Sequence, residues 1–314
     1  MRALLPLLVI AAPVVAQTTP PAAPPAAASA TGEASGPVAV DDTGLRMTVP
    51  VTVAGAGPFA FLIDTGAQRT VISRELAQAL GLAPGRSVRV TAMAGVAATP
   101  TVIIPALTIS PGGDTGVRIE APTFATENLG AAGLLGLDTL HDRRITIDLD
   151  ARTISIAPAG KRRPPSDDVP GEIVVRARSR LGQLIVTDAY VDTVRVRVIL
   201  DTGSVVTIGN EALRRRLAGR TGRITPIVLT SVLGRKLTAD LSTLSRVRIG
   251  AVRIESLPVA YADAPPFAQL GLSDKPAMLL GMDVIALFRR VEIDFPNREL
   301  RLSLPRATTA DRRH

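Results

Sequence analysis

Cysteine is absent from this chain of 314 residues, which excludes disulfide bonds, thiolate metal sites and cysteine nucleophiles. Histidine is almost absent, because the chain has only His141 and the final residue, His314. A zinc site or a Ser-His-Asp triad therefore has almost no residues to use. We expect His141 to lie in a polar surface turn with Asp138 and Asp142.

Aromatic residues are scarce, at 3% of the chain with no tryptophan, although the net charge is +8 and the pI is near 10.9. The basic residues cluster at 161–163, 214–216 and 312–313, which we expect to be a linker, a helix face and a tail. A nucleic-acid surface usually interleaves stacking rings among its basic residues. The sequence thus predicts solvated basic clusters and no nucleic-acid partner.

Long hydrophobic runs are limited to the N-terminus. Residues 3–16 are apolar after a basic start and end in Val14-Val15-Ala16, small residues suited to signal-peptidase cleavage before Gln17. The run is short and contains two prolines, which does not favour a membrane span. We predict a signal peptide at 1–16 and export to the periplasm or the medium, with an uncleaved N-terminal anchor as the alternative. The lack of cysteine favours a bacterial envelope compartment.

Residues 17–37 are almost entirely Pro, Ala, Thr, Ser and Gly, with Glu33 as their only charge. This composition cannot form a packed core and predicts an extended linker, either a tether or a propeptide. The chain as a whole is 46% hydrophobic and 20% charged, which is typical of globular proteins. Its length is sufficient for two domains with their own cores.

The chain contains four Asp-Thr-Gly triplets, and their contexts differ. Asp64 and Asp201 each follow an apolar run, at 59–63 and 196–200. The triplets at 42–44 and 114–116 lack such a run and are typical of turns, where Asp bonds the backbone and Gly supplies a positive φ. A carboxylate at the end of a buried strand is costly unless it has a purpose. Two such carboxylates suggest that they meet as an acid/base pair.

The two halves of the chain repeat one order of motifs. Each has an apolar strand ending in Asp-Thr-Gly, a helical pattern, a Leu-Leu-Gly and a strand closing on Ile-Asp. Asp64 lies 72 positions before Gly136, and Asp201 lies 80 positions before Gly281. The interval from that glycine to the closing aspartate is 12 positions in the first half and 13 in the second. This order and spacing indicate a duplicated unit.

Short β-branched runs separated by Gly and Pro turns predict a mostly β fold, a sandwich or a barrel. The expected strands are 47–53, 88–90, 102–109, 173–175, 194–200, 246–249 and 291–293. One helix is expected after each Asp-Thr-Gly, at 74–80 and 211–217, with N-caps at Ser73 and Asn210. The leucines expected to form a buried stripe on these helices are Leu76, Leu80, Leu213 and Leu217.

The motifs resemble those of aspartic peptidases, specifically bacterial retropepsin-like proteins that carry two lobes in one chain. The resemblance covers most of residues 40–304 and rests on Asp-Thr-Gly-Ala/Ser and Leu-Leu-Gly in each half. It implies two similar pepsin/retropepsin-like β-barrel lobes related by a pseudo-twofold axis. Each Asp-Thr-Gly loop would be threaded beneath the Leu-Leu-Gly strand in a ψ-shaped arrangement.

A charged, proline-rich segment near 160–168 marks the break between the halves. The expected domains are a signal peptide (1–16), a linker (17–37), an N-terminal lobe (38–160), an interlobe linker (161–172), a C-terminal lobe (173–305) and a basic tail (306–314).

The resemblance implies a shared-proton mechanism. Two carboxylates that meet at the axis cannot both ionise cheaply, so Asp64 and Asp201 would titrate as a pair. A water between them would lose a proton to the ionised member while it attacks a peptide carbonyl, and the protonated member would donate to the carbonyl oxygen. We expect an exported aspartic endopeptidase that acts on peptides or proteins as a monomer, with no metal or organic cofactor.

The same resemblance assigns supporting roles to the neighbouring residues. Thr65 and Thr202 would brace the two loops through hydroxyl bonds to the opposite backbone. Gly66 and Gly203 would keep the backbone close to the carboxylates, where a Cβ would obstruct it.

The two loops differ in the residue that follows the triplet. Ala67 follows the first and Ser204 follows the second. A hydroxyl at Ser204 could hydrogen-bond Asp201 and stabilise its ionised form. We therefore predict that Asp201 is the more acidic member of the pair.

Members of this family cover their substrate with a β-hairpin flap. The best candidate here is 90–97, with Met93, Ala94 and Gly95 at its centre, and 230–235 is its counterpart. Neither segment contains the tyrosine expected of a pepsin flap, so the resemblance to pepsin itself is weaker. Met93 would either contact substrate or only pack within the hairpin.

Two other interpretations fit the same residues. The aspartates could be duplicated turn residues in a non-enzymatic β scaffold. The protein could also be a binding module that holds peptides or an envelope protein without cleaving them. Half-sites shared between two chains are unnecessary, because both halves lie in one chain.

Overall fold

The computed structural model describes residues 38–39, 47–110, 116–161, 171–220 and 222–305. The predicted signal peptide, the Pro/Ala-rich linker, the basic tail and the triplet at 42–44 lie outside the described residues, as does most of the predicted interlobe linker. Of the triplet at 114–116, only Gly116 is described.

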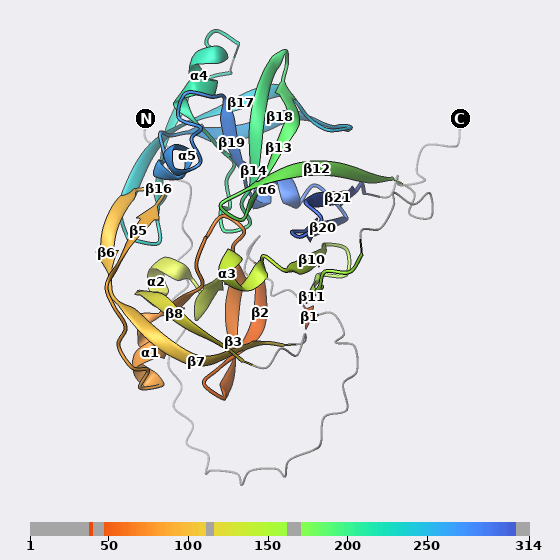
Figure 1. Cartoon of the computed structure of the whole chain (residues 1–314). Coiled ribbons are helices and arrows are strands. Elements are labelled where there is room, and N and C mark those ends of the chain that lie inside the picture. Colours follow the sequence, from red (N-terminus) through yellow and green to blue (C-terminus); the bar gives the residue numbers. More distant parts are fainter. Residues whose placement is uncertain (1–37, 40–46, 111–115, 162–170, 221, 306–314) are drawn as a thin grey trace, which may run out of the picture. The chain divides into compact units, whose positions relative to one another are not determined.

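The described chain is mostly β, as the sequence predicts (Figure 1). The strands of the first half are β1 (Val38–Ala39), β2 (Thr48–Val53), β3 (Ala56–Ile63), β4 (Val71–Ser73), β5 (Val88–Ala92), β6 (Gly95–Thr99), β7 (Thr101–Ile109), β8 (Val117–Phe124), β9 (Gly133–Leu135), β10 (Arg143–Asp148) and β11 (Thr153–Pro158). Those of the second half are β12 (Glu172–Arg180), β13 (Gln183–Val191), β14 (Val194–Leu200), β15 (Ile208–Gly209), β16 (Thr225–Thr230), β17 (Lys236–Ile249), β18 (Val252–Tyr261), β19 (Ala277–Leu280), β20 (Arg290–Asp294) and β21 (Glu299–Ser303). All seven strands expected from the sequence are present.

Each half closes a six-stranded circuit of the same connectivity. In the first half the order is β2-β3-β9-β4-β8-β7, with β7 paired back to β2. In the second half β13-β14-β19-β15-β18-β17 follows the same order, and β17 pairs back to β13. The parallel pairs also correspond, because β3–β9 and β4–β8 match β14–β19 and β15–β18. The duplicated unit predicted from the sequence is therefore a duplicated barrel.

The two barrels are joined through a shared sheet in the order β1-β11-β10-β20-β21-β12. Its centre is the antiparallel pair β10–β20, in which Arg144 lies opposite Asp294 and Asp148 lies opposite Arg290. This exchange of equivalent partners is the pattern that a twofold axis between the two strands produces. Both Nε and Nη2 of Arg144 donate to Oδ2 of Asp294, at 3.0 and 2.9 Å, so a charged pair crosses from one half to the other.

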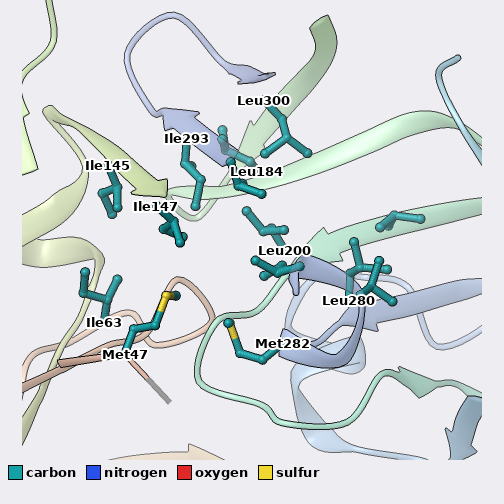
Figure 2. Packing of buried hydrophobic residues seen from close by; sticks show 14 of the residues in the cluster. Met47, Ile63, Ile145, Ile147, Leu184, Leu200, Leu280, Met282, Ile293 and Leu300 are labelled. Carbon is teal, nitrogen blue, oxygen red and sulfur yellow. The ribbon is translucent and has the colours of Figure 1, made fainter. Parts of the chain in front are cut away.

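A continuous apolar core lies against this shared sheet (Figure 2). Ile145 and Ile147 from β10 and Ile293 from β20 are buried at its centre. The residues around them come from both barrels and include Met47, Ile63, Leu184, Leu200, Leu280, Met282 and Leu300. Burial of large aliphatic side chains is the main stabilising contribution in a protein without disulfides.

The helices are short. They are α1 (Arg74–Ala79), α2 (Thr126–Leu129), α3 (Leu137–Leu140), α4 (Glu211–Arg216), α5 (Pro265–Gln269) and α6 (Met282–Ile285). Ser73 and Asn210 cap α1 and α4 as predicted, since their side chains accept from the N–H groups of Leu76 and Leu213. Among the described residues, no helix is both long and apolar enough to cross a bilayer.

The predicted leucine stripe is fully buried in the second half and only partly buried in the first, where Leu76 and Leu80 still pack against the core. Leu213 and Leu217 are buried, whereas Leu76 and Leu80 are only half-buried. The buried residue of α1 is Ala77, whose small side chain lets the helix pack closely on the barrel.

Candidate active site

Each strand that ends at Asp64 or Asp201 runs parallel to the Leu-Leu-Gly strand of its own half. The N–H of Asp64 donates to the carbonyl of Leu135 at 3.0 Å, which continues the β3–β9 pairing by one residue. The N–H of Asp201 donates to the carbonyl of Leu280 at 3.0 Å and continues β14–β19 in the same way. The apolar residues before each aspartate are buried, so each carboxylate stands where a buried strand leaves the barrel.

The glycine of each Leu-Leu-Gly lies directly against the loop that follows the triplet. A Cβ added to Gly136 would lie 2.4 Å from the carbonyl carbon of Arg69, and one added to Gly281 would lie 2.7 Å from that of Val206. Backbone contacts this short leave no room for a side chain. The loops are thus threaded past these glycines, which explains why both motifs occur in each half.

Two threonines join the loops to each other. Oγ1 of Thr65 donates to the carbonyl of Leu200 at 2.9 Å, and Oγ1 of Thr202 donates to the carbonyl of Ile63 at 2.7 Å. Each backbone N–H of the two threonines also donates to the other threonine's hydroxyl, at 3.1 Å in both directions. Both side chains are buried, so these four bonds are shielded from competing water.

The glycines that follow the threonines bring each loop into contact with the opposite carboxylate. A Cβ on Gly66 would lie 2.6 Å from Oδ1 of Asp201, and a Cβ on Gly203 would lie 2.4 Å from Cγ of Asp64. Neither glycine has a positive φ, so space rather than backbone conformation requires glycine here. The structure therefore brings Asp64 and Asp201, which are 137 positions apart, to one site.

The two carboxylates have different surroundings. Oδ1 of Asp64 accepts from the N–H groups of Gly66 and Ala67, both at 2.9 Å, and this side chain is half-buried. Asp201 is 8% exposed, and its Oδ1 accepts from the N–H of Gly203 at 3.1 Å. Burial and then the charge of Asp64 raise the pKa of Asp201 from 3.8 to about 7, against the smaller opposing effect of its backbone hydrogen bonds.

The prediction that Asp201 is the more acidic partner loses its support. It assumed a hydrogen bond from Ser204, but the Ser204 hydroxyl donates to the carbonyl of Val206 at 2.7 Å. Ser204 still supports the loop, because its carbonyl accepts from the N–H of Met282 at 2.8 Å. With no hydroxyl to stabilise the carboxylate, burial determines the direction of the shift in the pKa of Asp201.

A second pair of polar anchors was missed by sequence reasoning. Both the N–H and the hydroxyl of Thr70 donate to Oδ1 of Asp138, at 2.8 and 2.7 Å. In the second half Thr207 donates in the same way to Asp283, at 2.9 and 2.7 Å. Each threonine hydroxyl also accepts from the N–H of the Leu-Leu-Gly glycine. The sequence carries a signal for these anchors, because it repeats their spacing in both halves. Each threonine is six positions after the aspartate of its Asp-Thr-Gly, and its aspartate partner is two positions after the glycine of Leu-Leu-Gly.

The expectation for His141 agrees with the structure. His141 and Asp142 are exposed in the turn that follows α3, and Nδ1 of His141 lies 3.0 Å from the carbonyl of Leu137. Asp138 in α3 is exposed as well, although its Oδ1 accepts from Thr70, and desolvation of its carboxyl raises its pKa despite these hydrogen bonds.

A cavity of about 500 Å³ opens onto both carboxylates. Its apolar lining comes from both halves and includes Val90, Phe124, Leu134, Val232, Leu237 and Leu279. Among the lining residues, the only ionisable groups besides the two aspartates are Arg69 and Arg89, both exposed. Such a site suits an apolar ligand with a few polar groups near the carboxylates.

The predicted flap is a two-stranded hairpin of β5 and β6, which lies beside α5 of the other half (Figure 1). Met93 lies at its turn, lines the cavity and packs against the apolar cluster of the second half. Ala94 shares the turn and Gly95 begins β6 with a φ of +126°, and neither is among the lining residues.

The counterpart hairpin of β16 and β17 reaches in the opposite direction. Val232 and Leu233 at its turn pack against a cluster of the first half that includes Leu129 and Leu134. Nη1 of Arg235 donates to the carbonyl of Val96 at 3.5 Å, so the two hairpins touch. Each half thus extends one hairpin over the cavity onto the other half.

A comparison with family models identifies the family of the chain. A family model described as aspartyl protease matches the chain twice, at residues 49–139 and 187–284, which together make up more than half of it. Among solved structures, a retropepsin-like aspartic protease from Rickettsia conorii is 25% identical, over 43% of this chain and 91% of that chain, with a TM-score of 0.32. A search of curated proteins gave no significant match.

Proposed function

The chain belongs to the aspartyl protease family, and from this we propose that it is an endopeptidase that activates a water between Asp64 and Asp201. The observation that carries the proposal is the mutual approach of the two loops. Gly66 lies against the carboxylate of Asp201, and Gly203 lies against that of Asp64. Two carboxylates in one cavity share a proton and can act as acid and base in the same step.

The different surroundings of the pair assign these roles. Asp201, with its pKa raised to about 7, holds the shared proton and donates it to the oxygen of the scissile carbonyl. Asp64 accepts two backbone N–H bonds, which favour its ionised form, and takes the proton of the attacking water. As the C–N bond breaks, Asp64 passes the proton taken from water to the leaving amine and Asp201 takes back a proton from a hydroxyl of the tetrahedral intermediate, so the cycle balances without a cofactor.

The cavity supports a peptide with apolar side chains on both sides of the scissile bond. Its walls are largely apolar, and each half contributes to them. The two hairpins touch above it through Arg235 and Val96, so they must separate for a long chain to enter.

The test is cleavage of a diverse peptide library by the purified protein from about pH 3 to pH 7. Asp64→Asn and Asp201→Asn should each abolish cleavage while preserving the fold. Asp150→Asn is the matched control, because Asp150 is exposed in the turn between β10 and β11. A folded wild-type protein that binds peptides but cleaves none at any pH would contradict the proposal and favour a binding module.

We also propose that the protein is exported and that residues 1–16 are removed. The support is the basic start, the apolar run and the small residues before Gln17. Periplasmic protein whose N-terminal sequencing starts at Gln17 would agree. Protein that keeps Met1 in the membrane fraction would favour the anchor, and protein confined to the cytoplasm would contradict export.

A further inference from the structure

Gln183 reaches from the second half to the loop of Asp64. It is the first residue of β13, follows the tight turn Leu181-Gly182 and pairs with Arg180 of β12. Its side chain is buried at 4% exposure, and Nε2 donates to the carbonyl oxygen of Gly66 at 2.5 Å. Gln183 therefore holds Gly66, which lies against the carboxylate of Asp201.

The other end of the same amide is not satisfied by the protein. Oε1 of Gln183 is buried and has no hydrogen-bond partner among the residues that the structure describes. Buried amide oxygens are nearly always paired, because leaving one unpaired costs the full desolvation of that group. Gln183 is also among the residues that line the cavity containing Asp64 and Asp201.

The missing partner must be a hydrogen-bond donor, since an amide oxygen only accepts. An extended peptide supplies donors of this kind, because every non-proline residue carries a backbone N–H. These N–H groups lose their water when the peptide enters a largely apolar cavity and then require acceptors from the protein.

We propose that Gln183 binds the main chain of the substrate: Oε1 accepts a backbone N–H next to the scissile bond while Nε2 stays fixed to Gly66. This inference rests on the proposed function and names a contact that positions the peptide at the carboxylates. The fixed amide points its acceptor in one direction before substrate arrives, so little side-chain entropy is lost on binding.

The contact belongs to one side of the cleft. The strand registers show which positions of the two halves correspond. Thr48 lies opposite Leu62 in β2–β3, and Ile185 lies opposite Ile199 in β13–β14, so corresponding residues are separated by 137 positions, as the two aspartates are. At the equivalent position of the sequence the first half has Arg46 and not glutamine, and Arg46 is outside the described residues.

The test is a double-mutant cycle in which one change is made in the protein and the other in the ligand. The probes are peptides whose scissile bond is replaced by a hydroxyethylene group and whose backbone N–H groups are replaced one at a time by an ester oxygen. The wild-type protein should bind the probe about tenfold more weakly when the N–H at one position near the scissile bond is replaced. Gln183→Met should bind the parent probe about tenfold more weakly and be indifferent to replacement at that position.

Two further variants separate binding from loop support. Gln269→Met is the matched control, because Gln269 also lines the cavity but is exposed on α5, and it should keep the wild-type sensitivity. If Gln183→Met does not fold, Gln183→Lys serves instead: it keeps a donor for the Gly66 carbonyl but carries no acceptor, so it should be indifferent to replacement at the sensitive position.

Equal weakening of all probes by the Gln183 variants would overturn the proposal and leave Gln183 as a brace of the loop. A wild-type protein with no sensitive position, or with no affinity for any probe, would overturn it too. The cycle measures binding and needs no turnover. A wild type that binds as expected but does not cleave the unmodified peptide would contradict only the proposed function.

Discussion

Replacing Asp201 by asparagine tests the electrostatics of the site through stability. The carboxyl has its pKa raised from 3.8 to about 7 in the folded protein, so the folded state keeps a proton that the unfolded chain loses above about pH 4. Stability therefore decreases as the pH rises from about 4 to 7, and it changes no further once the group is ionised in both states.

The rise of the pKa from 3.8 to about 7, which includes the repulsion by Asp64, corresponds to roughly 4 kcal/mol across that window. Asparagine removes this penalty, because it carries no proton to lose. Its Oδ1 can still accept the N–H of Gly203. Relative to wild type, Asp201→Asn should thus gain up to about 4 kcal/mol between pH 4 and pH 7.

Urea unfolding at several pH values, followed by circular dichroism, measures the difference between the two proteins. Taking the difference removes the contributions of titrating groups other than Asp64, whose own pKa changes when its partner carboxyl is replaced. Asp150→Asn is the control and should follow wild type at every pH, because Asp150 is exposed. A difference between Asp201→Asn and wild type that stays constant from pH 4 to pH 7 would refute the assignment of the shared proton.

Three further outcomes follow from the same site. The kcat/KM for peptide cleavage should fall above about pH 7, because Asp201 then has no proton to donate; a rate that keeps rising toward pH 9 would contradict this. Gly203→Ala places a Cβ 2.4 Å from Cγ of Asp64 and should lower kcat/KM by about 100-fold, whereas Gly160→Ala, whose added Cβ would meet only Nη2 of Arg144 at 3.9 Å, should have no effect. Thr202→Val removes two of the four bonds between the loops and should cost about 1–3 kcal/mol in the free energy of unfolding; an unchanged urea midpoint would show that these bonds are not stabilising.

The parts of the fold that the sequence predicts are those with strong local patterns. The seven expected strands and the caps at Ser73 and Asn210 follow from residue types that are adjacent in the chain. The duplication also relates residues that are far apart in the chain, since a motif that occurs twice at similar spacing indicates equivalent places in two barrels. It would also have indicated Thr70 and Thr207, had their position after each aspartate been compared.

Other features of the site depend on competition between partners, and a sequence does not show which partner wins. The hydroxyl of Ser204 was predicted to bond Asp201, yet it donates to Val206, two positions away, as serine hydroxyls often do locally. Gln183 has no pattern around it that indicates a role. Only the three-dimensional structure places its amide between Gly66 and the cavity.

The site combines a symmetric backbone with asymmetric chemistry. The barrels share one connectivity and the threonine bonds are reciprocal. By contrast, burial differs between Asp64 and Asp201, and Gln183 contacts the Asp64 loop alone. In a dimer of identical chains each half would carry the same residues, so the proton could not be assigned to one side by sequence. Duplication within one chain lets the halves diverge, and the proposed division of the two carboxyls into an acid and a base requires such a divergence.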